Sequence, residues 1–523
     1  MVEVSNQMQI KIWNKYNYWL LAILCVFVAG IIVQTNMMLN FDVSWLMKVS
    51  NKLLSGGHYY TDFIETNPPL ILYLYMPAVL LAKIFHLSFT IAFRTYTFII
   101  AAGSIYLCNV LMRHIFDDTS NHIRYVLLVT IGFIFILMPG FAFGEREHFV
   151  LILTMPYLFL LDLRLSNKNI NIYLIFLIGV MAGLGFAIKP YFLFALIACE
   201  LYFMYKKRNL FACIRFETIC IGVVILLYLI SIFVFTPNYI YKILPLLYLY
   251  LVVTRAAFEL VISQITIVFW LIVLMAYFLF YRRLHYRSLA GIFIFASFGY
   301  LIAYLAQHTI WYYHLLPMLA MATMLMVLIV CEKLFAMIAK YKSGIKLLDV
   351  ILLVSLSILI IIGPIINTVK HTVSGITTSK QLRADELFQY MKRNAYGKLI
   401  YIFDERILIA SGLVDYAHAI SASRSPSQLF LPGLIWLSNK PNLTDTQKNR
   451  LMKYKKEIIN IVVEDLQKNK PKFILINQTK HSLPPNRKFS YIKFFSQDKR
   501  FRKIFKNYTI IMLGDLVVYK RNK

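Results

Sequence analysis

The chain is poor in acidic residues and in cysteine. Its 523 residues include 25 Asp and Glu against 54 Lys and Arg, which gives a formal net charge of +29. The six cysteines stand in apolar stretches or beside basic loops, and none lies in the polar C-terminal third: Cys25, Cys108, Cys199, Cys213, Cys220 and Cys331. Their spacing shows neither a disulfide framework nor a zinc-ligand pattern. The sequence therefore does not predict a disulfide-stabilised secreted domain or a zinc module.

Polar residues are too few for a soluble protein of this size. Apolar side chains make up 59% of the chain, and its mean hydropathy is +0.66. Most of the chain must therefore lie in lipid. A strongly basic protein can bind nucleic acid, but here the basic residues stand in short loops between apolar stretches. Because membrane orientation produces that pattern, we expect membrane lipid and no nucleic acid as a partner.

Apolar stretches long enough to cross about 30 Å of hydrocarbon recur along the chain. They predict about eleven transmembrane helices, near residues 18–35, 95–112, 125–140, 149–163, 172–188, 190–205, 218–235, 263–281, 288–305, 312–330 and 347–367. The first stretch follows Lys11 and Lys15 and lacks a small-residue cleavage site. It therefore predicts an uncleaved transmembrane helix rather than a signal peptide.

The basic loops decide how the further apolar run Pro69 to Phe85 is interpreted. If that run does not cross the membrane, all strongly basic loops fall on one side: Arg113 and Arg124; Arg164 and Lys168; Lys206, Lys207, Arg208 and Arg215; Arg282, Arg283 and Arg287; Lys333, Lys340, Lys342 and Lys346. By the positive-inside rule that side is cytoplasmic. We therefore expect Pro69 to Phe85 to be an interfacial or re-entrant helix, and Ile240 to Val253 to lie at the interface too.

The composition becomes polar after Ile366. We predict a transmembrane domain over 1–367 and a soluble extracytoplasmic α/β domain over 368–523, so the fold class is a polytopic α-helical membrane protein with a C-terminal α/β domain. Within the latter, the pattern predicts a helix over 382–393, strands over 399–403 and 473–477, and a β-hairpin with its turn at Gly514 and Asp515, and it contains a long amphipathic stretch over 444–468. No catalytic motif stands out there.

In this topology the polar residues at membrane depth fall on the extracytoplasmic side. They come from the first loop, the end of the third span (PGFAFGEREH), the end of the fifth span, and the loops after the seventh and ninth spans: Asp42, His58, Asp62, Glu65 and Asn67; Glu145, Arg146, Glu147 and His148; Lys189; Lys242; Gln307, His308, Trp311, Tyr312, Tyr313 and His314. Carboxylates beside cations suit a reaction in which an acid removes a proton while cations hold phosphate. A lipid-phosphate sugar fits this boundary, because its tail stays in the bilayer and its phosphate lies at the interface.

The expected reaction is glycosyl transfer. A carboxylate deprotonates an acceptor hydroxyl as it attacks the anomeric carbon, where oxocarbenium character develops. Arg146, Lys189 and His314 would stabilise the departing phosphate. The predicted substrate-binding residues are Asp62, Glu65, Arg146, Glu147, His148, Lys189, Tyr313 and His314. The sequence indicates no cofactor and leaves a divalent metal ion open.

The order of these short motifs resembles the GT-C superfamily of membrane glycosyltransferases. Across roughly residues 15–365 it runs through a first-loop acid, GG-x-YY-x-D and then PPL, the acid-bearing end of the third span, Lys-Pro at the end of the fifth, and aromatic-His-x-x-Pro. The chain looks most like the bacterial branch related to protein O-mannosyltransferases and aminoarabinose transferases. The resemblance implies a GT-C-like fold, Asp42 as general base, a polyprenyl-phosphate sugar donor, an envelope lipid, polysaccharide or protein as acceptor, and a place in the bacterial inner membrane.

The sequence departs from that family at three places, one of which is the third-span motif, Glu-Arg-Glu-His rather than a plain aspartate. Val43 follows Asp42 where many members have a second acid, and Asn67 stands before Pro68 where histidine is common. These departures leave the sugar and the acceptor undefined.

Structural roles also fit the site residues. Asp42 suits the N-cap of a helix from Val43 to Leu54, and Lys189 suits snorkelling to the interface. The other roles are solvation of a loop by Asp62 and Glu65, a local ion pair of Arg146 with Glu145 and Glu147, and an aromatic belt for Tyr313 and His314. A secondary transporter or lipid flippase is the alternative function, although no internal repeat is visible. A receptor or assembly protein is a third.

Overall fold

The computed structural model describes residues 2–339, 347–478, 489–512 and 516–522. The chain divides into two compact units. The first comprises Met1–Asn40, Phe93–Leu229 and Ala256–Thr377, and the second comprises Phe41–Ala92, Ile230–Arg255 and Thr378–Lys523. The second unit therefore combines segments of the predicted transmembrane domain with most of the predicted C-terminal domain.

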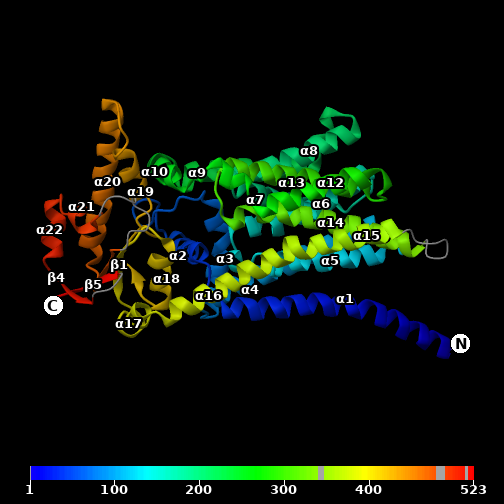
Figure 1. The fold of residues 1–523 in the computed structure, drawn as a ribbon, viewed down its shortest axis with the longest axis horizontal. Helices are drawn as coiled ribbons and strands as arrows, with labels where there is room; N and C mark the ends of the chain where they lie inside the picture. The colour runs from blue at the N-terminus through cyan, green and yellow to red at the C-terminus, as the bar shows by residue number, and fades with distance from the viewer. Residues whose placement is uncertain (1, 340–346, 479–488, 513–515, 523) are drawn as a thin grey trace. The chain divides into compact units, whose positions relative to one another are not determined.

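Long apolar helices dominate the first unit (Figure 1). Within the described residues, eight helices are long and apolar enough to cross a membrane, so the chain is a polytopic helical membrane protein. They are α1 (Val2–Asn36), α4 (Phe89–Ile115), α6 (Arg146–Leu165), α9 (Phe216–Phe235), α12 (Ile265–Phe280), α13 (Arg287–Gln307), α14 (Tyr312–Ala339) and the continuous helix formed by α15 (Leu347–Ile360), a π-helical turn (Ile361–Ile365) and α16 (Ile366–Ala384). Lys340, Lys342 and Lys346 of the predicted basic loops lie outside the described residues.

Three more of the predicted spans are helices, but short ones: α5 (Asn121–Ile136), α7 (Ile172–Ala187) and α8 (Leu193–Lys207). They have 16, 16 and 15 residues. At about 1.5 Å per residue each is about 24 Å long, which is less than the hydrocarbon thickness of about 30 Å. The count of about eleven crossings therefore stays a prediction.

The helix that begins at Leu347 continues through the predicted domain boundary at 367/368. It remains helical through a π-helical turn that contains Pro364 and ends only at Ala384. The change to polar composition after Ile366 therefore occurs within a continuous helix, because helix propensity and hydropathy are separate properties of a segment.

The middle of the bundle is formed by α14, which contacts α5, α6, α12, α13 and α15. It is far more buried than α1, since 94% of its apolar window is buried against 11% for α1. A close contact joins α13 to α8, because a Cβ on Gly299 would lie 2.4 Å from Ala195 Cα. Only glycine permits that approach. It sets the spacing between the middle of α13 and the first turn of α8.

A five-stranded mixed sheet forms the centre of the second unit. Its order is β2-β1-β3-β5-β4; β1 is parallel to β2 and β3, whereas β5 is antiparallel to β3 and β4. The strands are β1 (Leu399–Phe403), β2 (Ile420–Ser421), β3 (Phe473–Asn477), β4 (Tyr508–Met512) and β5 (Leu516–Arg521). The strands predicted at 399–403 and 473–477 are confirmed as β1 and β3. The predicted antiparallel pairing of the two C-terminal strands is confirmed as β4 and β5. The turn residues Gly514 and Asp515 lie outside the described residues.

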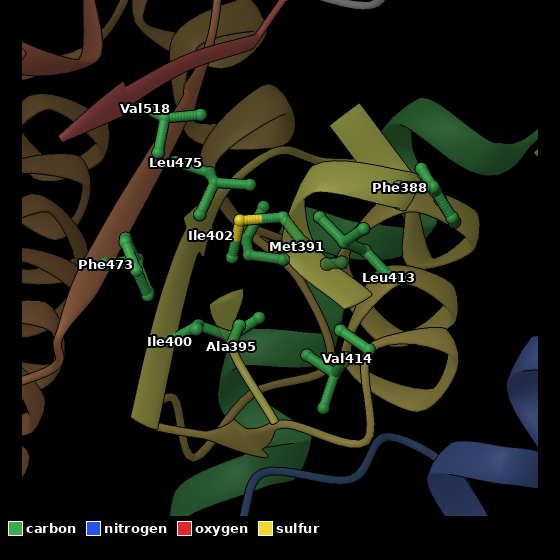
Figure 2. Close-up of a cluster of buried hydrophobic side chains, with 12 residues drawn as sticks. Phe388, Met391, Ala395, Ile400, Ile402, Leu413, Val414, Phe473, Leu475 and Val518 are labelled. Atoms are coloured by element: carbon green, nitrogen blue, oxygen red, sulfur yellow. The ribbon is translucent and has the colours of Figure 1, made fainter. Parts of the chain in front are cut away.

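Successive side chains of a strand point to opposite faces of the sheet, and helices pack against both faces. Ile400 and Ile402 of β1 point toward α17 (Glu386–Asn394) and α18 (Ile407–Tyr416), in a cluster that includes Met391 and Leu413 (Figure 2). On the other face, the ring of Phe403 packs against aromatic rings of α21 (Tyr491–Phe495) and α22 (Lys499–Phe505).

Two segments of this unit have helix bounds that differ from the ranges given by the sequence. The predicted helix over 382–393 is broken at Asp385, whose side chain accepts a hydrogen bond from Phe388 N and so caps α17. The amphipathic stretch over 444–468 forms α20 (Asp445–Asn469), which begins with a capping box of Thr444 and Gln447. The sequence did not predict α18 or α19 (Leu431–Ser438).

The remaining helices of the second unit come from the membrane-domain part of the sequence. They are α2 (Phe41–Leu54), α3 (Leu70–Ile84) and α10 (Leu244–Thr254). Within this unit α2 packs against α3 and α18, and α10 packs against α19. The apolar runs predicted to be interfacial, Pro69 to Phe85 and Ile240 to Val253, are thus helical, and both helices are too short to be candidate spans. Their interfacial position stays a prediction.

Candidate functional site

Four polar side chains meet at one end of the first unit, where α7 and α13 finish and α6 and α14 begin. Glu147 lies in the first turn of α6, Lys189 follows α7, Gln307 is the last residue of α13, and His314 lies in the first turn of α14. The Lys189 ammonium lies 2.5 Å from Glu147 Oε1, 3.1 Å from Gln307 Oε1 and 3.3 Å from His314 Nε2. We call these four residues the Lys189 cluster. It joins three of the five predicted groups of polar residues.

Lys189 leaves its helix because of the residue that follows it. A residue before proline disfavours the helical conformation, and Lys189 before Pro190 has an extended backbone with φ −136° and ψ 139°. Its side chain is only 9% exposed and is paired with Glu147. A snorkelling lysine keeps its ammonium in water. The geometry therefore favours a role inside the site over snorkelling.

His314 is held between a hydroxyl and the charged pair. Its Nδ1 is hydrogen-bonded to Thr309 Oγ1, while its Nε2 lies 3.4 Å from Glu147 Oε1 as well as next to the Lys189 ammonium. If Lys189 donates to Nε2, the ring is neutral and Nδ1–H donates to Thr309. If Nε2 is protonated, the ring donates to Glu147 instead. The imidazole can therefore exchange a proton without leaving its place.

The two acids beside Arg146 have different partners. Arg146 pairs with Glu145, with 3.0 Å between Nη2 and Oε2. Glu147 instead pairs with Lys189, and among the described residues its buried Oε2 accepts no hydrogen bond. A buried carboxylate oxygen without a donor is rare in native proteins. The local ion pair expected from sequence thus accounts for Glu145 but not for Glu147.

An aromatic ring lies close to both cations of this region. The ring centre of Tyr313 is 5.7 Å from the Arg146 guanidinium and 5.8 Å from the Lys189 ammonium. At these distances both cations gain a cation–π interaction. Tyr313 also packs edge-on against His314, with 4.4 Å between the ring centres. An aromatic belt at the interface does not require such contacts with buried cations.

The sequence placed the Glu-Arg-Glu-His segment at the end of the third span, and this is wrong: it begins α6. Arg146 is the first residue of α6, and Glu145 is its N-cap. The apolar run of the third span ends at Ile136 as α5, and a short 3-10 helix, Gly140–Ala142, follows. Gly140, the first residue of that turn, and Gly144, which follows it, both have positive φ and break the helix.

His148 is fully engaged by the backbone. Its Nδ1 accepts a hydrogen bond from Gly144 N at 2.9 Å, so its Nε2 carries the proton and donates to Phe135 O at 2.6 Å. The ring is entirely buried. Both nitrogens therefore hold the α5–α6 turn together, and neither is left for a substrate.

Asp42 belongs to the second unit. Its helix α2 begins at Phe41, two residues earlier than the helix expected from Val43, so Asp42 lies in the first turn rather than at the N-cap. A carboxylate there still interacts favourably with the helix dipole. The same helix is fixed to α18 by Ser44 and Lys48, which both contact Asp415.

The two other acids of the first loop are held by residues of their own unit. Glu65 is 3% exposed. Its Oε2 accepts from Trp45 Nε1 at 2.8 Å, and its Oε1 accepts from the backbone and side-chain nitrogens of Asn67 at 2.7 and 2.6 Å. Asp62 accepts from His58 N at 3.0 Å, and this hydrogen bond lowers the pKa of Asp62. These contacts order the loop.

Sequence reasoning missed two residues that organise these regions. Thr309 fixes the His314 ring, and Arg424 binds the first loop within the second unit, where its Nη1 donates to Tyr60 O at 3.1 Å and its carbonyl accepts from Ile64 N at 2.6 Å. Arg424 also pairs with Asp465 at 2.7 Å. Thr309 precedes His314 by five residues, in the loop before α14, which is a weak signal, whereas nothing local marks Arg424.

No group of three or more His, Cys, Asp or Glu side chains that could hold a metal ion occurs among the described residues. The cluster's own composition instead suits binding of an anion, since it presents lysine, histidine and a nearby arginine.

No protein-family model matches the chain, and no curated protein matches it. The resemblance to the GT-C superfamily thus depends on the short sequence motifs and their order alone.

Proposed function

We propose that this chain is a membrane glycosyltransferase of the GT-C kind. It transfers a sugar from a polyprenyl-phosphate donor to a hydroxyl group of an envelope lipid, polysaccharide or protein, at the extracytoplasmic face of a bacterial inner membrane. The observation that carries the proposal is the Lys189 cluster, in which a buried ammonium, imidazole and carboxylate meet at one end of a helical bundle. Such groups at a membrane boundary mark a functional site by default.

The helices that build the cluster have basic residues at their other ends. From the cluster, α6 runs to Arg164 and α14 runs past Lys333, and α13 starts at Arg287 and ends at the cluster. Basic loops are retained on the cytoplasmic side. This arrangement supports an extracytoplasmic position for the cluster.

Lys189 and Arg146 are the proposed phosphate ligands. Glu147 holds the Lys189 ammonium in a buried place, and the other two contacts of that ammonium are to neutral acceptors, the Gln307 amide and the His314 ring. A phosphate oxygen can replace a neutral acceptor without breaking the ion pair. Because a phosphate oxygen carries negative charge and the amide and imidazole acceptors do not, the exchange adds an attraction between opposite charges and favours the phosphate.

The proposed reaction is a direct displacement at the anomeric carbon. Asp42 takes the proton of the acceptor hydroxyl, whose oxygen forms a bond to the anomeric carbon. The bond from that carbon to the phosphate oxygen breaks, and its electron pair leaves with the polyprenyl phosphate. Lys189, Arg146 and His314 stabilise the charge on the leaving phosphate.

A transfer assay with a matched pair of variants tests the base. Asp42→Asn and Asp445→Asn both remove an acid from the first turn of a helix, but only the first removes the proposed base. With a panel of labelled polyprenyl-phosphate sugars, we expect Asp42→Asn to lower turnover by about a hundredfold or more and Asp445→Asn to leave it unchanged. Equal turnover by both folded variants would show that Asp42 is not the base.

One observation favours a transporter or lipid flippase as the second candidate. Lys189 is buried at the break between α7 and the next helix, and transporters place ionisable groups at such breaks. Reconstituted vesicles separate the two functions. Movement of a labelled polyprenyl-phosphate sugar between leaflets, with no sugar released when acceptors are supplied, would favour the flippase.

A further inference from the structure

The basic end of the first unit contains a groove of about 790 Å³ that the proposed reaction does not use. It lies between α1, α4 and α5. Its walls are apolar and include Leu20, Ile23 and Phe27 of α1 and Ile105 of α4. Its polar end is formed by the last turn of α4, the first turn of α5 and the turn that joins them. An apolar groove with one polar end matches the shape of an amphipathic ligand.

The polar end contains a buried arginine that pairs with no carboxylate among the described residues. Arg124 is 7% exposed, and its Nη2 donates to Tyr125 OH at 2.9 Å. Within the part of the chain that the structure describes, its Nε has no hydrogen-bond partner, and neither Arg124 nor the neighbouring Arg113 forms an ion pair. The buried Oδ1 of Asn109 is also without a donor there. A buried guanidinium without an acceptor is costly, so this end of the groove fits an anionic group.

Two carboxylates stand beside these arginines. Asp117 and Asp118 line the same end of the groove. Asp117 accepts hydrogen bonds from Ser120 and Thr119, and these lower the pKa of Asp117, so it remains anionic. The end therefore presents two cations and two anions. A head group that carries both a phosphate and an amine complements it, whereas a purely anionic head group meets repulsion from the aspartates.

We propose that this groove binds one phospholipid with a primary-amine head group, such as phosphatidylethanolamine. The phosphate lies against Arg124 and Arg113, the ammonium donates to Asp117 and Asp118, and an acyl chain follows the apolar wall of α1. A choline head group has the same net charge but no N–H donor, so it makes fewer hydrogen bonds. This site is independent of the proposed glycosyl transfer.

Native mass spectrometry of the full chain tests the head-group preference. The purified protein is offered an equimolar mixture of phosphatidylethanolamine, phosphatidylglycerol and phosphatidylcholine. We expect phosphatidylethanolamine to be retained about tenfold over the others, and Asp117→Asn/Asp118→Asn to abolish that preference. Equal retention of the three lipids by wild type, or a preference for phosphatidylglycerol, would overturn the proposal.

A second set of variants locates the lipid. Arg124→Gln is expected to lower retention about tenfold, while Arg283→Gln, which changes an exposed arginine of another basic loop, leaves it unchanged. Leu20→Trp fills the groove from α1, where the side chain is 66% exposed, and does not alter the arginine. Unchanged retention by the folded Leu20→Trp variant would show that the lipid binds elsewhere, and this holds even if Arg124→Gln fails to fold.

Discussion

Each end of the first unit contains a buried carboxylate that contacts two basic side chains, but the basic side chains differ. At the basic end Arg164 and Arg215 enclose Glu217, with Arg164 Nη2 3.1 Å from Oε2 and Arg215 Nε 2.9 Å from Oε1. At the other end Lys189 and His314 share one oxygen of Glu147. Arginine does not lose its proton in proteins, whereas lysine and histidine do. The partners of Glu217 therefore have fixed charge, whereas the partners of Glu147 have charge that can change.

Glu200 shows which part of this difference matters. Its Oε1 accepts from Tyr157 OH and from Arg215 Nη2, and within the described residues its Oε2 has no donor. Like Glu147, Glu200 therefore has one buried oxygen without a hydrogen-bond donor in the described part of the chain, but it lies at the arginine end. The lack of a donor to one carboxylate oxygen therefore does not by itself mark a reactive site. The distinguishing feature of Glu147 is that its partners can exchange protons or accept a phosphate.

The largest effect is expected from Lys189→Met. Loss of the ammonium removes a proposed phosphate ligand, and we expect turnover to fall by about a thousandfold. It also leaves Glu147 buried without its cation, which costs about 3–5 kcal/mol of stability. Adding Glu147→Gln removes the unpaired charge, so the double variant should recover stability but not turnover. Sugar-release assays and thermal unfolding in detergent measure the two effects. Full turnover by the double variant would make the cluster purely structural.

Glu217→Gln is the matching change at the arginine end. It leaves Arg164 and Arg215 without their shared carboxylate, so we expect a stability loss of about 3–5 kcal/mol. Turnover per folded molecule should remain at the wild-type level, because these arginines hold no substrate. Unfolding curves and turnover normalised to folded protein check this. A loss of turnover as large as that of Lys189→Met would end the contrast between the two ends.

A smaller effect is expected from Tyr313→Leu. The change removes a ring that contacts both Arg146 and Lys189, and cation–π interactions contribute about 0.5–2 kcal/mol. We therefore expect KM for the lipid-linked donor to rise by a few-fold to about thirtyfold, with little change in kcat. Tyr313→Phe keeps the ring and serves as the control. If Tyr313→Phe were equally impaired, the hydroxyl rather than the ring would be the important group.

The sequence predicted the elements well where one local signal determined them. All eleven apolar stretches are helical, and β1 and β3 match the predicted strands residue for residue, because their apolar side chains are bounded by polar residues. It missed α18, whose apolar sequence reads like a strand or a buried helix until its packing is known. The lengths of α5, α7 and α8 differ from those of their predicted ranges by at most one residue.

Pairing within the site could not be read from the sequence. Glu145 and Glu147 flank Arg146 symmetrically along the chain, and only the rotation of the first turn of α6 directs one to Arg146 and the other to Lys189. The donors to Glu65 come from Trp45, twenty residues away, and from Asn67. Which partner each carboxylate binds depends on tertiary packing, and residue type and spacing do not predict that packing.

The smallest effect concerns Asp62, an acid of the second unit whose hydrogen bonds come from its own loop. Its pKa lies below the ordinary value of 3.8, mainly because His58 N donates to it. The ionised carboxylate therefore stabilises the loop above that value, and the stabilisation is lost as pH falls through the lowered folded pKa. The side chain is 38% exposed, so solvent screening keeps the contribution below about 1 kcal/mol. Asp62→Asn should speed hydrogen exchange of the His58 amide at neutral pH and not at strongly acidic pH. It should leave turnover near wild type, since a carboxylate engaged within its own loop resembles Glu217 rather than Glu147; a thousandfold loss of turnover would place Asp62 with the reactive acids.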